Sequence, residues 1–173
     1  MSISQNLLPE YDQEMTNTRK LLERVPDDKL NYQPHPKSMT LGRLATHIAE
    51  LPGWGKQTLE SEVLEMEPGF KPHIAASREE LLGMFDKSAA EARAAIAAAS
   101  DEDWHKIWSF KVAGQTIISL PRTAVVRSMV MNHLIHHRAQ LGVFLRLNDV
   151  EIPGMYGPSA DEMKNWQPQS ASA

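Results

Sequence analysis

Apolar residues recur at helical spacing in four stretches of the chain, and two of these lie in its first half. The first stretch ends before Pro26, and steps of three and four residues give it the seam Leu8, Tyr11, Met15, Thr18, Leu22 and Val25. The second begins after Thr40, a residue type that caps helices, and places on one face Leu41, Leu44, Ile48 and Leu51. Because Pro52 lacks a backbone donor, we expect a kink there, with helix resuming from Trp54 to about Met66.

The other two helical stretches lie in the second half. Ser77 and Glu80 have the S-x-x-E spacing of a capping box, and a stripe of mostly small residues follows them as far as Ala99. Pro121 suits the first turn of the last helix, which we expect to end before Asn148. Between these helices, residues 102–120 combine β-type residues with partial alternation, and a short hairpin or an extended crossover fits them equally.

Four amphipathic helices without a strong set of strands predict an all-α fold, a four-helix bundle with crossover connections. We expect at least one crossover because the connections are longer than those of simple up-and-down bundles. We assign residues 1–150 to the bundle domain. Residues 151–173 are rich in proline, glycine and serine, and we expect a mostly irregular C-terminal tail packed on the bundle through Met155, Tyr156 and Trp166.

Composition and charge narrow the classes of partner. The chain has 173 residues, of which 42% are hydrophobic and 23% are charged, as in globular proteins. Its 18 basic and 22 acidic residues give a formal net charge of −4 without a basic stripe, which argues against a nucleic-acid partner. No apolar run is long enough to span a membrane, and no signal-peptide pattern is visible at the start, so we expect a cytoplasmic protein without a membrane partner.

The absence of cysteine removes several kinds of chemistry. Disulfides, cysteine-ligated metal sites and a protein thiol nucleophile all need cysteine. Any thiol in a reaction of this protein would therefore come from a small molecule. The obvious metal ligands that remain are the seven histidines, His35, His47, His73, His105, His133, His136 and His137.

Three of these histidines fall on predicted core faces. His47 lies between Leu44 and Ile48, and His133 and His137 are four residues apart on one face of the last helix. Burying three imidazoles requires partners, which a divalent metal ion such as zinc, nickel or iron would supply. Three protein ligands leave a coordination position free, as in catalytic sites.

Other interpretations of the histidines stay open. An H-x-x-x-H pair alone is also found on surfaces and in cores, and His136 could chelate together with His133 or be a solvated neighbour. A haem held by two histidines fits the ligand count but leaves the third histidine unexplained. A di-iron carboxylate site is disfavoured, because only Glu102 and His105 have the required E-x-x-H spacing.

Three segments carry a resemblance to a known family. They are THIAE at residues 46–50, NHLIHHRAQLG at residues 132–142 and IPGMYGPSAD at residues 152–161. In this order they resemble the DinB-like (DinB/YfiT-like) family, and the similarity extends from the first residue to about residue 160. The resemblance implies a four-helix bundle with crossover topology. It also implies one metal ion held by the histidine triad His47, His133 and His137, the same three that the face argument selects.

The resemblance further implies a class of activity. Characterised relatives include thiol-dependent transferases and isomerases that use mycothiol or bacillithiol, and the family often forms homodimers. It therefore implies a homodimeric metalloenzyme, a transferase or hydrolase that activates a low-molecular-weight thiol or water toward a small-molecule substrate. The alternative is a non-catalytic metal-stabilised helical bundle that serves as a binding or interaction protein.

The resemblance leaves neighbouring polar residues without a settled role. His136 matches a position that is often histidine in the family without being counted as a ligand. Arg138 either holds an anionic group of a substrate or pairs with an acidic residue on a neighbouring helix, and we favour the ion pair. Glu50 is a candidate hydrogen-bond partner of a ligating imidazole only by its proximity in sequence, and no catalytic residue is assigned.

Overall fold

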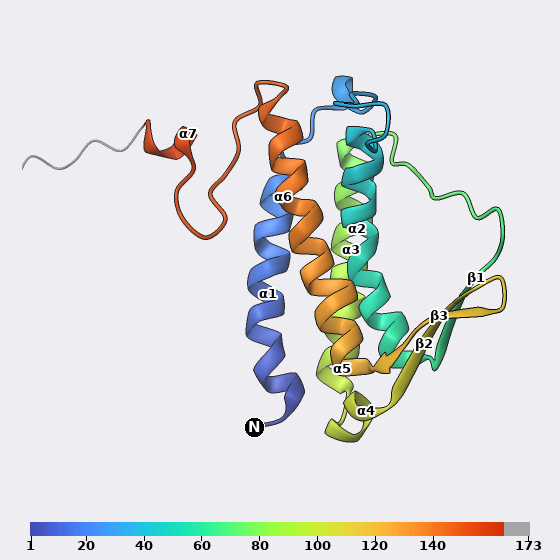
Figure 1. Ribbon diagram of the computed structural model, residues 1–173. Coiled ribbons are helices and arrows are strands. Elements are labelled where there is room, and N and C mark those ends of the chain that lie inside the picture. The colour runs from blue at the N-terminus through green and yellow to red at the C-terminus, as the bar shows by residue number, and fades with distance from the viewer. Residues whose placement is uncertain (165–173) are drawn as a thin grey trace, which may run out of the picture.

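Four long helical segments lie side by side and form most of the computed structural model, which describes residues 1–164 (Figure 1). They are α1 (Ile3–Leu22), α2 (Leu41–Glu60), α3 (Arg78–Ala98) and a continuous run of α5 (Arg122–Val125), the π-helix η2 (Val126–Asn132) and α6 (His133–Arg146). The short helices are η1 (Asp27–Lys29), α4 (Asp101–His105) and α7 (Ala160–Met163).

Side-chain caps explain where the long helices begin. The Thr40 hydroxyl accepts a hydrogen bond from the Arg43 amide, as predicted, and Ser77 caps α3 in the same way. The predicted capping box forms only in this half, because the Glu80 carboxylate accepts from the Ala76 amide. Ser2 caps α1 about two turns before Pro9, so this proline lies inside the helix and not in its first turn. Pro52 also lies inside a helix, and α2 continues through it to Glu60 because packing of its buried face outweighs the lost backbone bond.

The connection between α2 and α3 is the crossover that the sequence predicts. α1 and α6 run in one direction, whereas α2 and α3 both run in the opposite direction (Figure 1). Because α2 and α3 are parallel neighbours, the chain between residues 60 and 78 has to return along the full length of the helices. This returning segment, residues 67–77, lies beside α2 (Figure 1).

The prediction of an all-α chain is wrong, because the structure contains a small three-stranded sheet. Its strands are β1 (Val63–Met66), β2 (Ile107–Val112) and β3 (Gln115–Pro121), in the order β1-β2-β3. β1 is parallel to β2, and β2 is antiparallel to β3. The helix predicted to reach about Met66 ends at Glu60, because its last residues pair with a strand more than 40 positions later in the chain.

Of the two interpretations of residues 102–120, the hairpin is correct. β2 and β3 are joined through Ala113 and Gly114, both of which have positive φ values, 48° and 76°. Two successive residues with positive φ match the right-handed twist of a tight hairpin, which explains the glycine.

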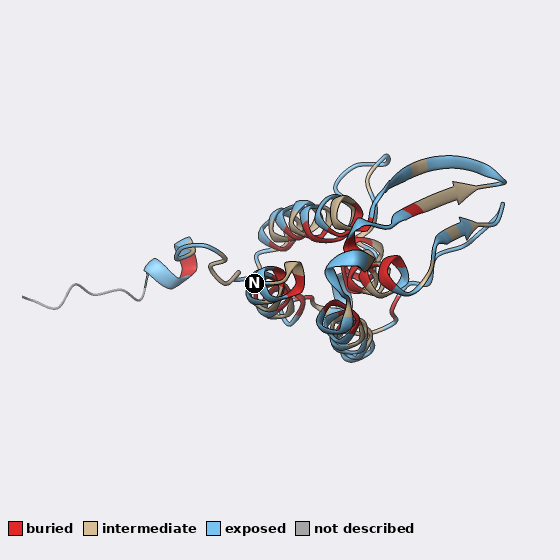
Figure 2. Cartoon of the chain, turned by 90° about the horizontal axis from the view of Figure 1, so that it is seen from below, coloured by how far each residue is buried: buried red, intermediate tan, exposed pale blue. Residues whose placement is uncertain are grey.

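The buried faces of the long helices meet in one core, as the end-on view shows (Figure 2). The largest fully buried side chains include Trp104 and Trp108, which come from α4 and β2. The Trp104 indole N–H donates to the Ser4 hydroxyl at 2.9 Å, so the end of the bundle is closed by an apolar ring whose polar atom has a partner.

Arg138 forms the ion pair with a neighbouring helix that the sequence favours. Its guanidinium is 2% exposed and lies 2.6 Å from the Glu14 carboxylate of α1. The Tyr156 hydroxyl donates to the same carboxylate at 2.8 Å, and the Asn17 amide donates to the Met155 carbonyl. These contacts attach the irregular segment after α6 to α1, whereas Trp166 lies outside the described residues.

Among residues 1–164, no helix combines the length and the apolar character needed to cross a membrane.

Candidate metal centre

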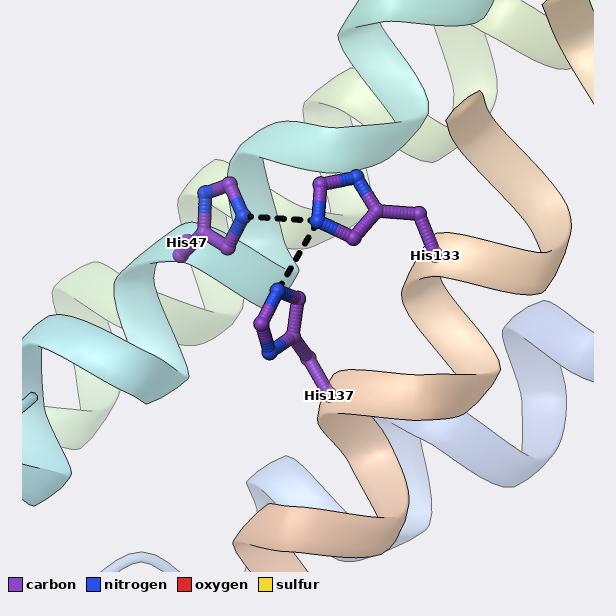
Figure 3. A group of neighbouring side chains, drawn as sticks. All are labelled: His47, His133 and His137. Atoms are coloured by element: carbon purple, nitrogen blue, oxygen red, sulfur yellow. Dashed lines mark hydrogen bonds between the residues drawn. The ribbon is translucent and has the colours of Figure 1, made fainter. Parts of the chain in front are cut away.

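Three histidines from two helices converge between α2 and α6 (Figure 3). His47 comes from α2, and His133 and His137 come from successive turns of α6. The Nε2 atom of His133 lies 3.4 Å from that of His47 and 2.8 Å from that of His137. One nitrogen from each ring lies within 4.8 Å of the other two, and all three residues are partly buried.

The second nitrogen of each ring faces an acceptor. His133 Nδ1 lies 3.3 Å from the Met129 carbonyl oxygen, and His137 Nδ1 lies 2.7 Å from Oε1 of Gln140. His47 Nδ1 lies 3.9 Å from a Glu50 carboxylate oxygen. Because these oxygens can only accept, the contacts of His133 and His137 place the hydrogen on Nδ1 and leave the Nε2 lone pair free. The nearby Glu50 oxygen favours the same form of His47.

The convergence therefore brings unprotonated nitrogens together. Burial, with the nearby His47 imidazole, lowers the pKa of His133. Burial also lowers the pKa of His137 to about 4, and this effect exceeds the opposing one of the Gln140 hydrogen bond. With neutral rings and hydrogens on Nδ1, the 2.8 Å contact between His133 and His137 has no hydrogen to share, and its lone pairs repel unless a cation lies between them.

The donor set fits a divalent transition-metal ion. Bonds of about 2.0–2.1 Å at tetrahedral or right-angled positions separate neighbouring nitrogen ligands by about 2.9–3.4 Å. The two separations from His133 Nε2, 3.4 Å to His47 and 2.8 Å to His137, are close to this range. Neutral imidazoles with hydrogen-bonded Nδ1 atoms are the usual form of ligating histidine. Nitrogens this close cannot lie on opposite faces of a haem, so the haem interpretation does not fit.

Local structure explains how the rings reach one point. His47 is flanked by Leu44 and Ile48, which are 2% and 0% exposed, so its face of α2 turns toward the core. His133 is the first residue of α6 and directly follows the π-helix η2, which contains Met129. Such π-helical turns are frequent at functional sites because they change the phase of the side chains along a helix.

Glu50 and Arg43 border the cluster on α2. Their side chains are 3.1 Å apart and 26% and 19% exposed. Burial raises the pKa of Glu50, but the contacts with His47 and Arg43 outweigh this effect and lower it below its usual value. Glu50 is therefore ionised at neutral pH, and its charge favours the hydrogen on His47 Nδ1. A cavity of about 570 Å³ opens beside these residues, toward β1.

The remaining histidines lie outside the cluster. His136 is exposed, and its Nε2 lies 3.1 Å from the Gln140 amide nitrogen. Gln140 thus contacts His136 with its nitrogen and His137 with its oxygen. His73 lies 2.7 Å from Glu80 on the surface. Sequence reasoning missed Gln140, although its position three residues after His137 on a helix was a usable signal.

Comparisons with known proteins show the family of this chain. A model of the DinB family matches residues 1–170. The chain belongs to the DinB family. The resemblance seen in the sequence is thereby confirmed, and this DinB-family chain carries its three convergent histidines in segments that resemble the family.

Individual relatives are distant. YrdA, an uncharacterized protein of Bacillus subtilis (strain 168), is 25% identical over 161 residues, which cover 91% of this chain and 90% of that protein. The crystal structure of a DinB-like protein from Bacillus cereus ATCC 10987 has a TM-score of 0.69 and 23% identity, covering 90% of this chain and 98% of its own. That of a DinB-like protein, YjoA, from Bacillus subtilis has a TM-score of 0.66 and 16% identity, covering 87% and 97%. The two structures establish the fold.

Proposed function

We propose that this protein is a mononuclear metal-dependent enzyme of the thiol-dependent transferase or hydrolase type. The ion would be held by Nε2 of His47, His133 and His137. The observation that carries the proposal is the convergence of three Nε2 lone pairs on one point while every Nδ1 faces an acceptor. This arrangement is costly without a cation and favourable with one.

A divalent ion held by neutral imidazoles supplies Lewis acidity, which lowers the pKa of water or of a small-molecule thiol enough to provide a nucleophile at neutral pH. The protein itself contributes no thiol, because the chain has no cysteine. Gln140 and the Met129 carbonyl keep the two α6 rings in the correct tautomer, and the charge of Glu50 does so for His47.

The cavity beside His47 favours an enzyme over a purely structural metal site. A structural ion is enclosed by protein ligands, whereas His47, one of the three histidines, lines a hollow of about 570 Å³ that leaves room for a reacting molecule. The non-catalytic metal-stabilised bundle is the alternative that an experiment has to separate from this proposal.

Metal analysis of untagged protein is the first test. We expect one zinc, nickel or iron ion per chain in the purified protein or after addition of the metal. We expect lower thermal stability after the ion is removed with a chelator, because an ion that binds only the native state stabilises it. If none of the three metals binds stoichiometrically, the proposal is wrong.

Cobalt-substituted protein separates the enzyme from the structural alternative. We expect its visible absorption spectrum to change on addition of small thiols, because these molecules enter the free coordination position. A spectrum that responds neither to thiols nor to small anions would support a closed, structural site. A screen of low-molecular-weight thiols with electrophilic acceptors then identifies the reaction.

A further inference from the structure

The cavity beside the histidine cluster has one polar wall, and its other walls are mostly apolar. It lies between α2, β1 and the segment that returns after β1, and His47 and Glu50 belong to the wall that it shares with the candidate metal centre. Its volume of about 570 Å³ falls within the range of small-molecule sites, roughly 300–1,000 Å³. The other walls are mostly apolar, and Trp54, Leu64, Met66 and Phe70 contribute to them.

Side chains from one face of β1 and two aromatic rings form the apolar wall. Leu64 and Met66 occupy alternate positions of β1 and are less exposed than the residues on either side, so both face α2. The Trp54 ring lies 6.0 Å from that of Phe110 on β2, and this contact fixes the indole at the cavity. Phe70 is 62% exposed at the opening, where an apolar ligand would cover it.

The charged residues around the cavity disfavour an anionic ligand. Arg43 is the basic residue among those that line it, and its guanidinium is already paired with Glu50 at 3.1 Å. Glu65 and Glu67 add negative charge at the opening, and the Glu65 carboxylate accepts a hydrogen bond from the Gly114 amide. Without a bound metal ion, an incoming anion would meet net negative charge and no unpaired basic residue in this lining, whereas a neutral or positively charged molecule would not be repelled.

We infer that this cavity binds the organic substrate of the site, a small molecule whose aromatic or branched apolar body carries no negative charge. The reacting group faces His47, and the apolar body lies between Trp54 and Phe70. That the ligand is a substrate rests on the proposed function. The preference for an uncharged or cationic apolar molecule rests on the cavity alone.

Nitrogen-15 NMR titrations of metal-free and zinc-loaded protein test the inference with three probes of the same size. Benzyl alcohol, benzylamine and benzoate share one ring and differ in charge. We expect the first two to shift the Trp54 indole resonance and the Leu64 and Met66 amides, the indole being assigned from Trp54→Phe. In the metal-free protein we expect benzoate to bind about threefold more weakly than benzyl alcohol or worse, because its carboxylate is repelled by the surrounding glutamates.

Variants of two apolar residues with similar exposure test whether the probe binds in this cavity. Phe70→Ala should raise the dissociation constant for benzyl alcohol about threefold or more, because the ring loses an aromatic contact. Ile117→Ala removes a side chain that is 58% exposed on β3, away from the cavity, and should leave the constant unchanged. Equal effects of the two variants would overturn the location.

Other outcomes are also decisive. Benzoate binding to metal-free protein as tightly as benzyl alcohol would overturn the charge preference. Shifts confined to residues away from Trp54 would overturn the site. If zinc binds stoichiometrically but neither metal-free nor loaded protein binds the neutral probe, this inference fails and the proposed function stands. If the probe binds but no metal does, the proposed function fails and the cavity preference stands.

Discussion

Replacement of Gln140 by leucine tests whether hydrogen bonds behind the histidines tune the metal site. Gln140 Oε1 accepts from His137 Nδ1 at 2.7 Å, and leucine keeps the size of the side chain while removing that acceptor. Loss of such an outer partner weakens metal binding by about 10- to 100-fold, or about 1.4–2.7 kcal/mol. We therefore expect one ion still to bind, with a dissociation constant raised by that factor.

The same change predicts a metal-dependent loss of thermal stability. At a free metal concentration of 1,000 times the wild-type dissociation constant, binding stabilises the native state by about 4.1 kcal/mol. Binding that is 10 to 100 times weaker leaves about 2.7 to 1.4 kcal/mol. At about 2–4 °C per kcal/mol for a chain of this size, the loaded variant should melt about 3–11 °C below the loaded wild type.

Calorimetry of loaded and metal-free proteins provides the assay, and Gln13→Leu provides the control. Gln13 is exposed on α1, so the control makes the same substitution on a helix surface away from the site. We expect the control to keep the wild-type metal affinity. If Gln140→Leu lowers the melting temperature equally with and without metal, the hydrogen bond does not act through the ion and the reasoning is refuted.

Three other predictions follow from the same structure. His47→Ala should abolish stoichiometric metal binding. His73→Ala, a surface control, should leave it unchanged, and equal metal content in the two variants would remove His47 from the site. Arg138→Met leaves a buried carboxylate unpaired and should lower the free energy of unfolding by about 3–5 kcal/mol in urea titrations, and a loss below about 1 kcal/mol would contradict the buried pair. Hydrogen bonds from Arg146 and a backbone amide lower the pKa of Asp161 to about 2, below an unfolded value near 3.9. The ionised carboxylate therefore contributes fully to the free energy of unfolding above about pH 4, and this contribution disappears as the pH falls toward 2. Melting temperatures measured across this pH range should show the loss of this Asp161 contribution in the wild type and not in Asp161→Asn.

The candidate ligands were predictable because their pattern is local. The spacing of His133 and His137 places both on one face of a helix, and Leu44 and Ile48 fix the face of His47. Gln140 could have been found by the same spacing rule. The Met129 carbonyl could not, because a backbone atom carries no sequence signal and its position depends on the π-helix η2.

Strand β1 and its pairing with the hairpin were missed for a different reason. Residues 63–66 become a strand only because β2, far along the chain, offers a parallel partner, and no window of sequence contains both strands. The apolar walls of the cavity beside His47 depend on that pairing, since Leu64 and Met66 reach α2 from β1. The error in fold class thus also hid the binding surface.

The sequence by itself determined the four helical segments, the inward faces of three histidines, the absence of a protein thiol and the likeness to a family, because periodicity and residue chemistry are local properties. Only the tertiary structure decided that the ring of α2 meets the two rings of α6, and that their lone pairs converge while their other nitrogens find acceptors. Helix packing and crossover topology set these distances, and both arise from contacts between residues far apart in the chain.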